Sequence, residues 1–335
     1  MSMLRDARVL VTGATGFIGV NLLRRLRSTG CRIRATLHRR PAVVADEAIE
    51  YVTADLTRME DCRRAIEGID VVFMCAASTS GAAVIQATPL VHVTPNVVMN
   101  AQMLEAAYGA HAKKFVWFSS SVAYPPTGER PVREEELLDG EPYATYFASG
   151  WMKRYTEILC RLYAQRLRPA LPTVVLRPTN VYGPYDDFDF ATSHATAAMI
   201  RKVVERHDPI ELWGTGEDIR DVLYVDDLID AVMRAVERVE TYDPINLGFG
   251  QGYRLTDLLH MILELDGYSD ARVRCDPSKP SMVPIRLVDV SKAERVLGFK
   301  ARTSVRDGLR KTIEWYRRSR GLAPTGEPLA AQAEA

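Results

Sequence analysis

Short apolar runs alternate with amphipathic stretches along most of the chain. Residues 9–11 form a run of the kind that a fully buried parallel strand requires, and the run stops at Thr12-Gly13. Residues 17–26 follow with apolar side chains at helical spacing and with arginines left for solvent. This alternation repeats, and it predicts an α/β fold built on a doubly wound parallel sheet. Further strands are predicted at residues 32–37, 50–55, 71–75, 114–118 and 173–177, and further helices at 61–68, at 96–108 and around 151–157.

Beyond about residue 180 the chain has a different texture, with proline, glycine and aromatic residues in loops and shorter elements. A turn is predicted at 178–184 and strands at 223–225 and 245–247, with a helix at 226–239 that returns to the large sheet. We therefore expect a larger domain and a smaller lobe, followed by a disordered tail. The expected ranges are 1–180 joined by 220–247 for the domain, 181–219 and 248–320 for the lobe, and 321–335 for the tail.

A glycine-rich turn joins the first predicted strand to the first predicted helix. Its glycines stand three residues apart, so the first can make the tight turn, the second lets the backbone approach a diphosphate, and the third packs helix against strand. The N–H groups of the helix N-terminus then face the anion. The spacing alone also fits an ordinary strand-to-helix turn, but its context favours a dinucleotide-binding Rossmann domain, with the smaller lobe left for substrate. The predicted dinucleotide contacts are Gly13, Thr15, Gly16, Phe17, Ile18 and Gly19.

The end of the second predicted strand bears on the type of dinucleotide. An acidic residue there would bind the ribose 2′-hydroxyl, whereas an arginine accommodates a 2′-phosphate. Arg39 and Arg40 stand at this point and the acid is absent, so we prefer NADP over NAD, with two exposed loop charges as the alternative. Asp55 is placed to meet an adenine edge. The other predicted cofactor contacts are Leu56, Ala76, Ala77 and Pro178, after later strands.

The composition excludes several classes of function. Lys plus Arg and Asp plus Glu number 43 each, which removes the electrostatic argument for nucleic acid or an anionic membrane surface. The five cysteines are scattered without metal-ligand spacing and their number is odd, which favours a reducing compartment. No apolar run approaches the roughly 20 residues of a membrane span. The first predicted strand begins close to the N-terminus of the sequence, so no signal peptide is expected. We therefore expect a cytoplasmic enzyme with no metal, no nucleic acid and no membrane partner.

Several motifs, taken together, resemble those of the extended short-chain dehydrogenase/reductase family, specifically its nucleotide-sugar epimerases, dehydratases and reductases. The resemblance covers about residues 8–318 and implies a nucleotide-sugar substrate. Within the family, the pattern looks most like an enzyme that is both a 4-keto-sugar 3,5-epimerase and a 4-reductase. The motifs that carry the resemblance are residues 13–19, 119–125, 177–184, 193–194, 213–221, 224–228 and 287–292.

The resemblance implies a catalytic serine or threonine, a tyrosine, and a lysine four residues after the tyrosine. Ser120 matches the serine, whose hydroxyl bonds the substrate oxygen at the carbon that exchanges hydride. Lys153 matches the lysine, whose charge holds the nicotinamide ribose. Spacing places Ser149 at the tyrosine position, since neither Tyr143 nor Tyr146 is followed by lysine four residues on. The usual acid/base is therefore expected to be missing.

An aliphatic hydroxyl is far less acidic than a phenol, whose unperturbed pKa is ~10, so Ser149 alone makes a poor general base. Tyr146 lies about one helical turn earlier, and its phenol is a candidate substitute. Ser149 is alternatively a helix N-cap, or it marks a loss of the catalytic group.

The epimerase branch of the family pairs a cysteine two residues after the catalytic serine with a histidine in the loop after the Tyr-Gly-Pro turn. His194 matches the histidine, whereas Val122 stands at the cysteine position. A histidine, with a pKa near ~6.5, suits proton transfer at one carbon. The alternative for His194 is a polar residue beside the helix that follows.

Substrate contacts are also implied by the resemblance. Arg220 resembles the family's diphosphate-binding arginine and offers a bidentate fork to phosphate. Lys202 is a second candidate cation, and Asn180 is expected to align the substrate. The family also implies a homodimer formed through two helices of each subunit. The predicted substrate contacts are Ser121, Asn180, Lys202, Trp213 and Arg220.

Three functions stay open from the sequence. The first is an NAD(P)-dependent epimerase or reductase of a GDP- or UDP-hexose or its 4-keto derivative, with an atypical active site. The second is a non-redox isomerase or lyase that uses His194 and keeps the dinucleotide as a structural cofactor. The third is a catalytically weak regulatory protein that binds dinucleotide and sugar.

Overall fold

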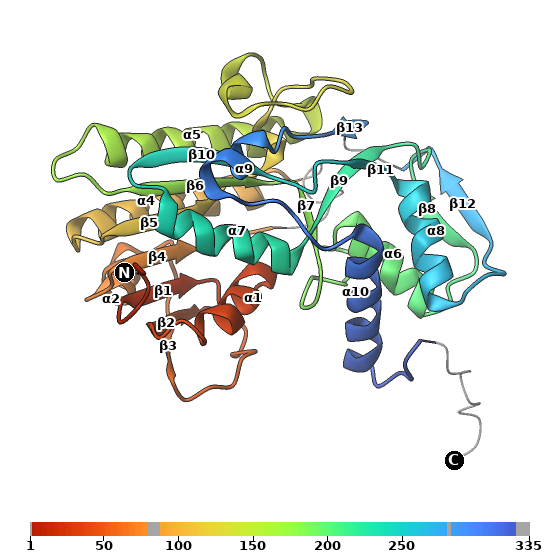
Figure 1. Ribbon diagram of the computed structural model, residues 1–335, viewed down its shortest axis with the longest axis horizontal. Coiled ribbons are helices and arrows are strands. Elements are labelled where there is room, and N and C mark those ends of the chain that lie inside the picture. Colours follow the sequence, from red (N-terminus) through yellow and green to blue (C-terminus); the bar gives the residue numbers. More distant parts are fainter. Residues whose placement is uncertain (1, 80–87, 280–282, 326–335) are drawn as a thin grey trace.

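The structure is a computed structural model, and it describes residues 2–79, 88–279 and 283–325. Its centre is a seven-stranded sheet, order β10-β6-β5-β4-β1-β2-β3, in which every neighbouring pair is parallel (Figure 1). The strand order reverses direction between β1 and β4, which confirms the predicted doubly wound α/β fold. The strands are β1 (Arg8–Thr12), β2 (Arg32–Leu37), β3 (Ile49–Thr53), β4 (Val71–Met74), β5 (Lys114–Phe118), β6 (Thr173–Pro178) and β10 (Tyr242–Leu247).

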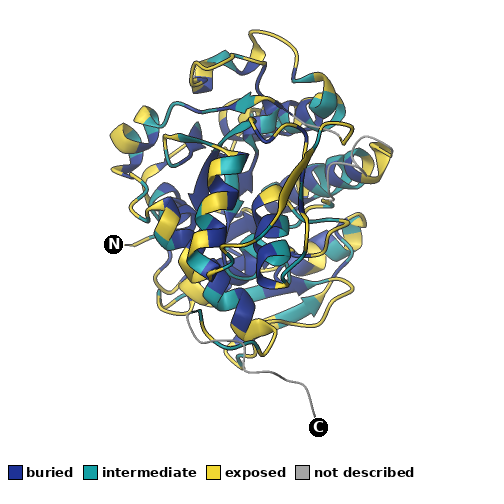
Figure 2. Cartoon of the chain, turned by 90° about the vertical axis from the view of Figure 1, so that its right-hand side faces the viewer, coloured by how far each residue is buried: buried dark blue, intermediate teal, exposed yellow. Residues whose placement is uncertain are grey.

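Helices cover both faces of this sheet, and alternate side chains of a strand enter opposite cores. Val9 and Val11 of β1 lie in the core on one face, and Leu10 between them lies in the core on the other. Figure 2 shows the resulting dark interior of buried residues. The first core also contains α1 (Phe17–Leu26), α7 (Val225–Arg238) and α9 (Ser291–Leu297). The second contains α2 (Met59–Ile66), α4 (Leu90–Gly109) and α5 (Phe147–Gln165).

A smaller lobe has its own core, in which α6, α8 and α10 pack through Ile200, Leu258 and Leu309. Its strands form one four-stranded sheet and one two-stranded sheet. The first holds β7 (Asn180–Tyr182), β9 (Ile219–Tyr224), β11 (Gly252–Arg254) and β13 (Ile285–Arg286), and the second β8 (Ile210–Trp213) and β12 (Val273–Asp276). The helices are α6 (Ala195–Val204), α8 (Leu255–Asp266) and α10 (Val305–Ser319), and short 3₁₀ turns elsewhere are η1 (Ser121–Ala123), η2 (Glu134–Leu138) and η3 (Ala144–Tyr146).

The structure corrects three expectations about the lobe. β9 pairs with β7, β11 and β13, so the return to the large sheet begins at α7 and not at residue 220. The segment 178–184, expected as a turn, contains β7, because its backbone pairs with β9. The segment that contains α9, expected in the lobe, packs on the large sheet through Ala293 and Leu297. An apolar pattern shows that a segment is buried but not which core it joins.

The predicted start of the disordered tail, at residue 321, is too early, because the next residues are still packed on the lobe. Leu322 packs against the lobe core, and Arg317 Nε donates to the carbonyl of Ala323 at 2.6 Å. Residues 326–335 of the predicted tail lie outside the described residues. Among the residues that the structure describes, no helix is long and apolar enough to cross a membrane, and no three His, Cys, Asp or Glu side chains group as a metal site.

Candidate functional site

The turn between β1 and α1 is a cradle with no room for a side chain at two of its glycines. Gly13 has a φ of +63°, and a Cβ there would lie 2.7 Å from the Cα of Ala76, beyond the end of β4. A Cβ on Gly19 would lie 2.3 Å from the carbonyl oxygen of Gly13. The N–H of Gly16 donates to the same carbonyl at 3.0 Å. The turn is therefore bare backbone, packed between β1 and β4.

Helix α1 begins in this turn with an uncapped N-terminus. Gly16 is its N-cap residue, offers no capping side chain, and is followed by a first turn with no acidic residue. Thr15, Phe17 and Ile18 are half-buried around it. The first N–H groups of a helix have no partner within it, and the helix dipole favours an anion there. The bare turn and these donors fit the diphosphate of a dinucleotide.

The remaining predicted cofactor contacts lie along the same edge of the sheet. The N–H of Ala76 donates to Thr12 Oγ1 at 3.0 Å, which holds the loop after β4 beside the glycine turn. Ala77 is exposed in this loop, and Leu56 is buried beyond β3. Pro178 is the last residue of β6. These residues follow the carboxyl ends of parallel strands, which is where open α/β sheets bind their ligands.

Charged side chains lie beyond β2 and β3, where the adenosine end of a dinucleotide is expected. Arg39 and Arg40 are exposed in the loop after β2. Asp55 accepts hydrogen bonds from the hydroxyl and the N–H of Thr57 at 2.7 and 3.0 Å. These bonds hold the pKa of the Asp55 carboxyl below its ordinary value, with a smaller contribution from nearby His38. Asp55 is therefore an ionised acceptor that is partly engaged within its own loop.

Ser120 and Lys153 meet at the carboxyl end of β5. Ser120 Oγ accepts from the N–H of Val122 at 3.3 Å and caps the short turn η1. Lys153 Nζ donates to the carbonyl of Phe118 at 2.8 Å. Burial lowers the pKa of Lys153 to about 8, although the carboxylate of Glu157 opposes the shift. The two residues that the family motif singles out are thus brought to one place.

The two other hydroxyl-bearing candidates lie at the start of α5. Ser149 lies one helical turn before Lys153 on α5, and its Oγ donates to the carbonyl of Tyr146 at 3.2 Å. Burial raises the pKa of the Tyr146 phenol, and the positive charges that oppose this shift are those of Arg220 and Arg286. The charges of these two arginines therefore act on the Tyr146 phenol.

Arg220 and Arg286 form a pair on neighbouring strands. They are Cα partners in the parallel register of β9 and β13. Arg220 donates to the carboxylate of Asp218 at 2.9 Å and to the carbonyl of Pro284 at 3.3 Å. Arg286 is 6% exposed, and its Nη2 has no hydrogen-bond partner in the part of the chain that the structure describes. Burial lowers its pKa to about 10. A buried unpaired donor is costly, so an anion bound at this pair would be strongly held.

Two predicted substrate contacts bond within the protein through their side chains, and a third is buried. Asn180 Nδ2 donates to the carbonyl of Asp221 at 3.0 Å and links β7 to β9. Lys202 Nζ donates to the carbonyl of Glu211 at 2.5 Å and links α6 to β8. Ser121 is buried as the first residue of η1. Their contacts with a substrate stay predictions.

Trp213 lies near a pocket that adjoins the arginine pair. The side chain is 38% exposed, and Lys279 Nζ is 6.0 Å from the centroid of its ring. The pocket has a volume of about 440 Å³, and its lining includes Pro277, Lys279 and Asp218, the partner of Arg220. A ligand anion at the arginines could therefore extend towards this pocket.

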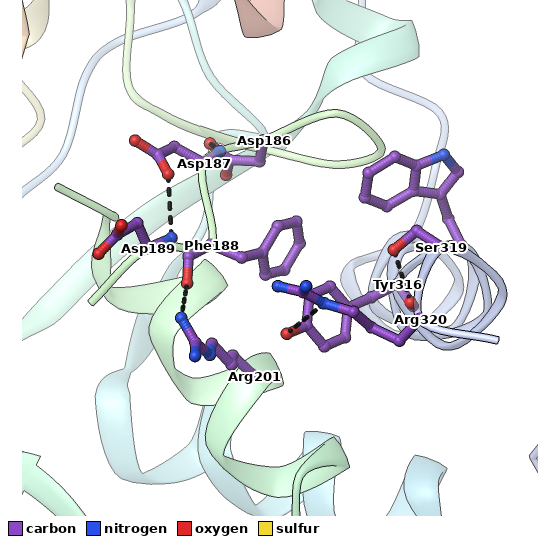
Figure 3. Close-up of a pocket in the computed structure, with 9 residues that line it drawn as sticks. Asp186, Asp187, Phe188, Asp189, Arg201, Tyr316, Ser319 and Arg320 are labelled. Atoms are coloured by element: carbon purple, nitrogen blue, oxygen red, sulfur yellow. Dashed lines mark hydrogen bonds between the residues drawn. The ribbon is translucent and has the colours of Figure 1, made fainter. Parts of the chain in front are cut away.

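The loop that leads to His194 is fastened to α10 (Figure 3). The ring centroid of Phe188 lies 4.4 Å from that of Tyr316 and 6.0 Å from that of Trp315. Arg201 donates to the carbonyl of Phe188 at 3.0 Å. Beside these contacts, the loop and the end of α10 together line a pocket of about 330 Å³. His194 is the N-cap residue of α6, and desolvation lowers the pKa of its imidazole. A neutral imidazole can accept a proton, and its part in catalysis stays a prediction.

Known proteins match nearly the whole chain. A GDP-L-fucose synthase from Sinorhizobium fredii is 30% identical over 326 residues, which are 94% of this chain and 97% of that protein. A dTDP-4-dehydro-6-deoxy-D-allose reductase from Streptomyces sp is 32% identical over 321 residues, 92% and 96% of the two chains. The solved UDP-glucose 4-epimerase of Thermotoga maritima, with UDP-glucose, has a TM-score of 0.84 at 26% identity, covering 93% of this chain and 99% of that chain.

The family model described as "NAD dependent epimerase/dehydratase family" matches residues 9–248. This range includes the glycine turn, Ser120, Lys153 and Arg220. It confirms the resemblance that the motifs indicate. The chain belongs to the NAD-dependent epimerase/dehydratase family of nucleotide-sugar enzymes.

Proposed function

We propose that the protein is an NADP-dependent enzyme that exchanges hydride at C4 of a nucleotide-linked hexose or 6-deoxy-4-keto-hexose. The arrangement of α5 is the observation that carries the proposal. Its N-cap residue Tyr146 is subject to the charges of Arg220 and Arg286, and Lys153, about two turns on, bonds the end of β5 next to Ser120. One helix thus joins a site suited to an anion to a site suited to hydride transfer.

This arrangement indicates how the nucleotide sugar binds. Its diphosphate lies between Arg220 and Arg286, whose guanidinium groups match phosphate oxygens, and the Tyr146 phenol donates to the same anion. The nucleotide base extends towards Trp213, and Asn180 aligns the sugar. In this assignment Tyr146 is a substrate contact and does not replace the missing acid/base.

The chemistry takes place at the end of β5. When bound, the nicotinamide supplies or accepts the hydride. Ser120 donates its hydroxyl hydrogen to the C4 oxygen, and the Lys153 ammonium holds the nicotinamide ribose. Ser149 is too weak an acid to protonate the C4 oxygen, so the proton comes from water beside Ser149 and Lys153. Slow turnover follows from this route.

The preference for NADP depends on Arg39 and Arg40. Both are exposed beyond β2, where the 2′-phosphate of NADP is expected and where an acidic residue would instead bind the 2′-hydroxyl of NAD. An Arg39→Ala, Arg40→Ala double variant should lose about tenfold or more in NADPH affinity and keep its NADH affinity, because it loses only charge-assisted bonds to that phosphate.

The activity is tested by mixing the protein with NADPH and a panel of GDP-, UDP- and dTDP-linked 4-keto-6-deoxyhexoses. We expect at least one member to consume the absorbance of the reduced nicotinamide, and NADH to support a lower kcat/KM with the same substrate. The double arginine variant is the matched control for the cofactor. If no member of the panel oxidises either cofactor, the proposed reaction is wrong.

We also propose that the protein is a cytoplasmic homodimer formed through α4 and α5. An apolar stripe runs along α5, with side chains 39–54% exposed that recur every three or four residues and so share one face. Leu90 and Val91, on the adjoining α4, are 72% and 51% exposed. A second copy with the same stripe can cover it in a two-fold interface. The stripe comprises Phe147, Trp151, Tyr155, Ile158 and Leu162.

A Trp151→Glu, Ile158→Glu double variant is expected to sediment as a monomer, because the interface would bury two unpaired carboxylates. Analytical ultracentrifugation measures the mass. Val273→Glu, at an exposed valine on β12, is the matched control and should leave the dimer intact. A wild-type protein that sediments as a monomer at micromolar concentration would contradict the proposal.

A further inference from the structure

A buried ion pair lies beneath the proposed site. Glu157 of α5 and Arg177 of β6 each have a side chain only 2% exposed. Arg177 Nη2 donates to Glu157 Oε2 at 2.5 Å, and its Nε donates to Oε1 at 3.0 Å. The desolvation cost of two such charges can exceed their mutual attraction, and well-packed apolar residues can replace a buried pair without loss of stability. Stability alone therefore does not account for this pair.

The pair is bonded to both ends of the segment that carries Ser120. At the near end, Ser119 Oγ donates to Glu157 Oε1 at 2.6 Å. At the far end, Arg177 Nη1 donates to the hydroxyl of Tyr124 at 2.5 Å. The Ser120 segment is thus held at two points by one ion pair.

Tyr124, at the far end of the Ser120 segment, is bonded to a further strand as well. Tyr124 is fully buried, and its hydroxyl donates to Asn246 Oδ1 of β10 at 2.6 Å. Asn246 Nδ2 in turn donates to the carbonyl of Val132 at 3.0 Å. The polar chain therefore extends from α5 through β6 to β10, and the Ser120 segment has little freedom to shift against the sheet.

The same helix holds Lys153. Lys153 and Glu157 stand four residues apart on α5 and so face the same way. They bond two successive residues at the end of β5, since Lys153 Nζ donates to the carbonyl of Phe118 and Glu157 accepts from Ser119. A shift of α5 along β5 would move Lys153 and break the Ser119 bond together.

We infer that the Glu157–Arg177 pair is a positioning element that fixes Ser120 and Lys153 relative to each other. This inference rests on the function proposed for Ser120 and Lys153. The pair itself does not face the substrate. It acts through Ser119 and Tyr124, whose hydroxyl groups transmit its position to the Ser120 segment.

Two variants break the links without unpairing a charge. Ser119→Ala removes the near bond and Tyr124→Phe removes the far one, and both leave Glu157 paired with Arg177. Thr173→Val is the matched control: Thr173 is fully buried in the same strand as Arg177, and its Oγ1 donates to the carbonyl of Cys160 at 3.0 Å. It loses a buried hydroxyl bond at the opposite end of β6.

Hydrogen exchange measures the segment directly. The amides of Ala123 and Tyr124 donate to the carbonyls of Ser120 and Ser121, so they exchange when the segment opens. We expect Ser119→Ala and Tyr124→Phe each to speed exchange in residues 120–124 by about threefold to tenfold, and Thr173→Val to leave it unchanged.

Steady-state kinetics test whether the position of the Ser120 segment affects the reaction. Each of the two variants should lower kcat about tenfold with KM changed less than twofold, since misplaced catalytic groups still bind substrate. The double variant should lose less than the product of the single losses, because either break frees the same segment. Thr173→Val should lower the melting temperature similarly and keep kcat.

Unchanged exchange in both variants would overturn the inference, and so would faster exchange with unchanged kcat. A wild-type protein that turns over no nucleotide sugar would overturn the proposed function instead. In that case the exchange measurement alone still decides whether the pair fixes the segment.

Discussion

Replacing Ser149 with tyrosine is expected to raise kcat for 4-keto-sugar reduction by about 100-fold or more, because a positioned proton donor contributes roughly 10²–10⁴-fold. Lys153 lies one helical turn further on α5 and bonds the end of β5. Its positive charge would lower the pKa of a phenol placed at residue 149 towards neutrality. Steady-state oxidation of NADPH with the best substrate of the panel measures the gain.

Ser149→Phe is the control for this variant. It fills the same space with an aromatic ring but carries no hydroxyl, so we expect no gain. An equal gain in both variants would mean that the ring improves packing and does not transfer a proton. No gain in Ser149→Tyr would favour a changed mechanism or a protein that only binds dinucleotide and sugar.

The central strands could be predicted from sequence because both of their faces are buried. β5 matches the predicted range 114–118, and all its residues are buried, since a strand covered by helices on both sides is largely apolar. β2 matches the predicted range 32–37 although Arg32 is exposed and Arg34 is only partly buried. The short strands β7 and β13 could not be predicted this way. They have three and two residues, and β9 pairs with both from distant parts of the chain.

The residues of the candidate site also fall into those that sequence could identify and those that only the fold reveals. Gly13, Ser120 and Lys153 were identified because they belong to motifs with short, fixed spacings. Arg286 was missed, since only the register of β13 against β9 places it beside Arg220; its one sequence signal is its position directly before the 287–292 motif. Pairing across a sheet is a property of the fold and leaves little local pattern.

Tyr146 shows the limit of spacing arguments on a helix. Its position one turn before Ser149 suggested a phenol that replaces the missing acid/base. In the structure Tyr146 is the last residue of the 3₁₀ turn η3 and the N-cap residue of α5, so it lies outside the regular α-helix. Helical neighbours face one another only within the regular part of a helix. The phenol is subject to the charges of Arg220 and Arg286, and its part in catalysis stays a prediction.

NADPH binding is expected to weaken as the pH rises above about 8, the value to which burial lowers the pKa of Lys153. Only the ammonium form makes charge-assisted bonds to the ribose and attracts the diphosphate. The bound state therefore keeps a proton that the free protein loses above this pKa. By linkage, the affinity then falls by up to about tenfold for each further pH unit.

Lys153→Met is expected to remove this pH dependence and to weaken NADPH binding about 10- to 100-fold at pH 7, because a hydrogen bond from a charged group contributes roughly 1.5–3 kcal/mol. Titrations of NADPH fluorescence between about pH 6.5 and 9.5 measure both effects. Lys300→Met, at an exposed lysine, is the control and should follow the wild-type curve. A slope that persists in Lys153→Met would assign the titration to another group and remove Lys153 from the cofactor site.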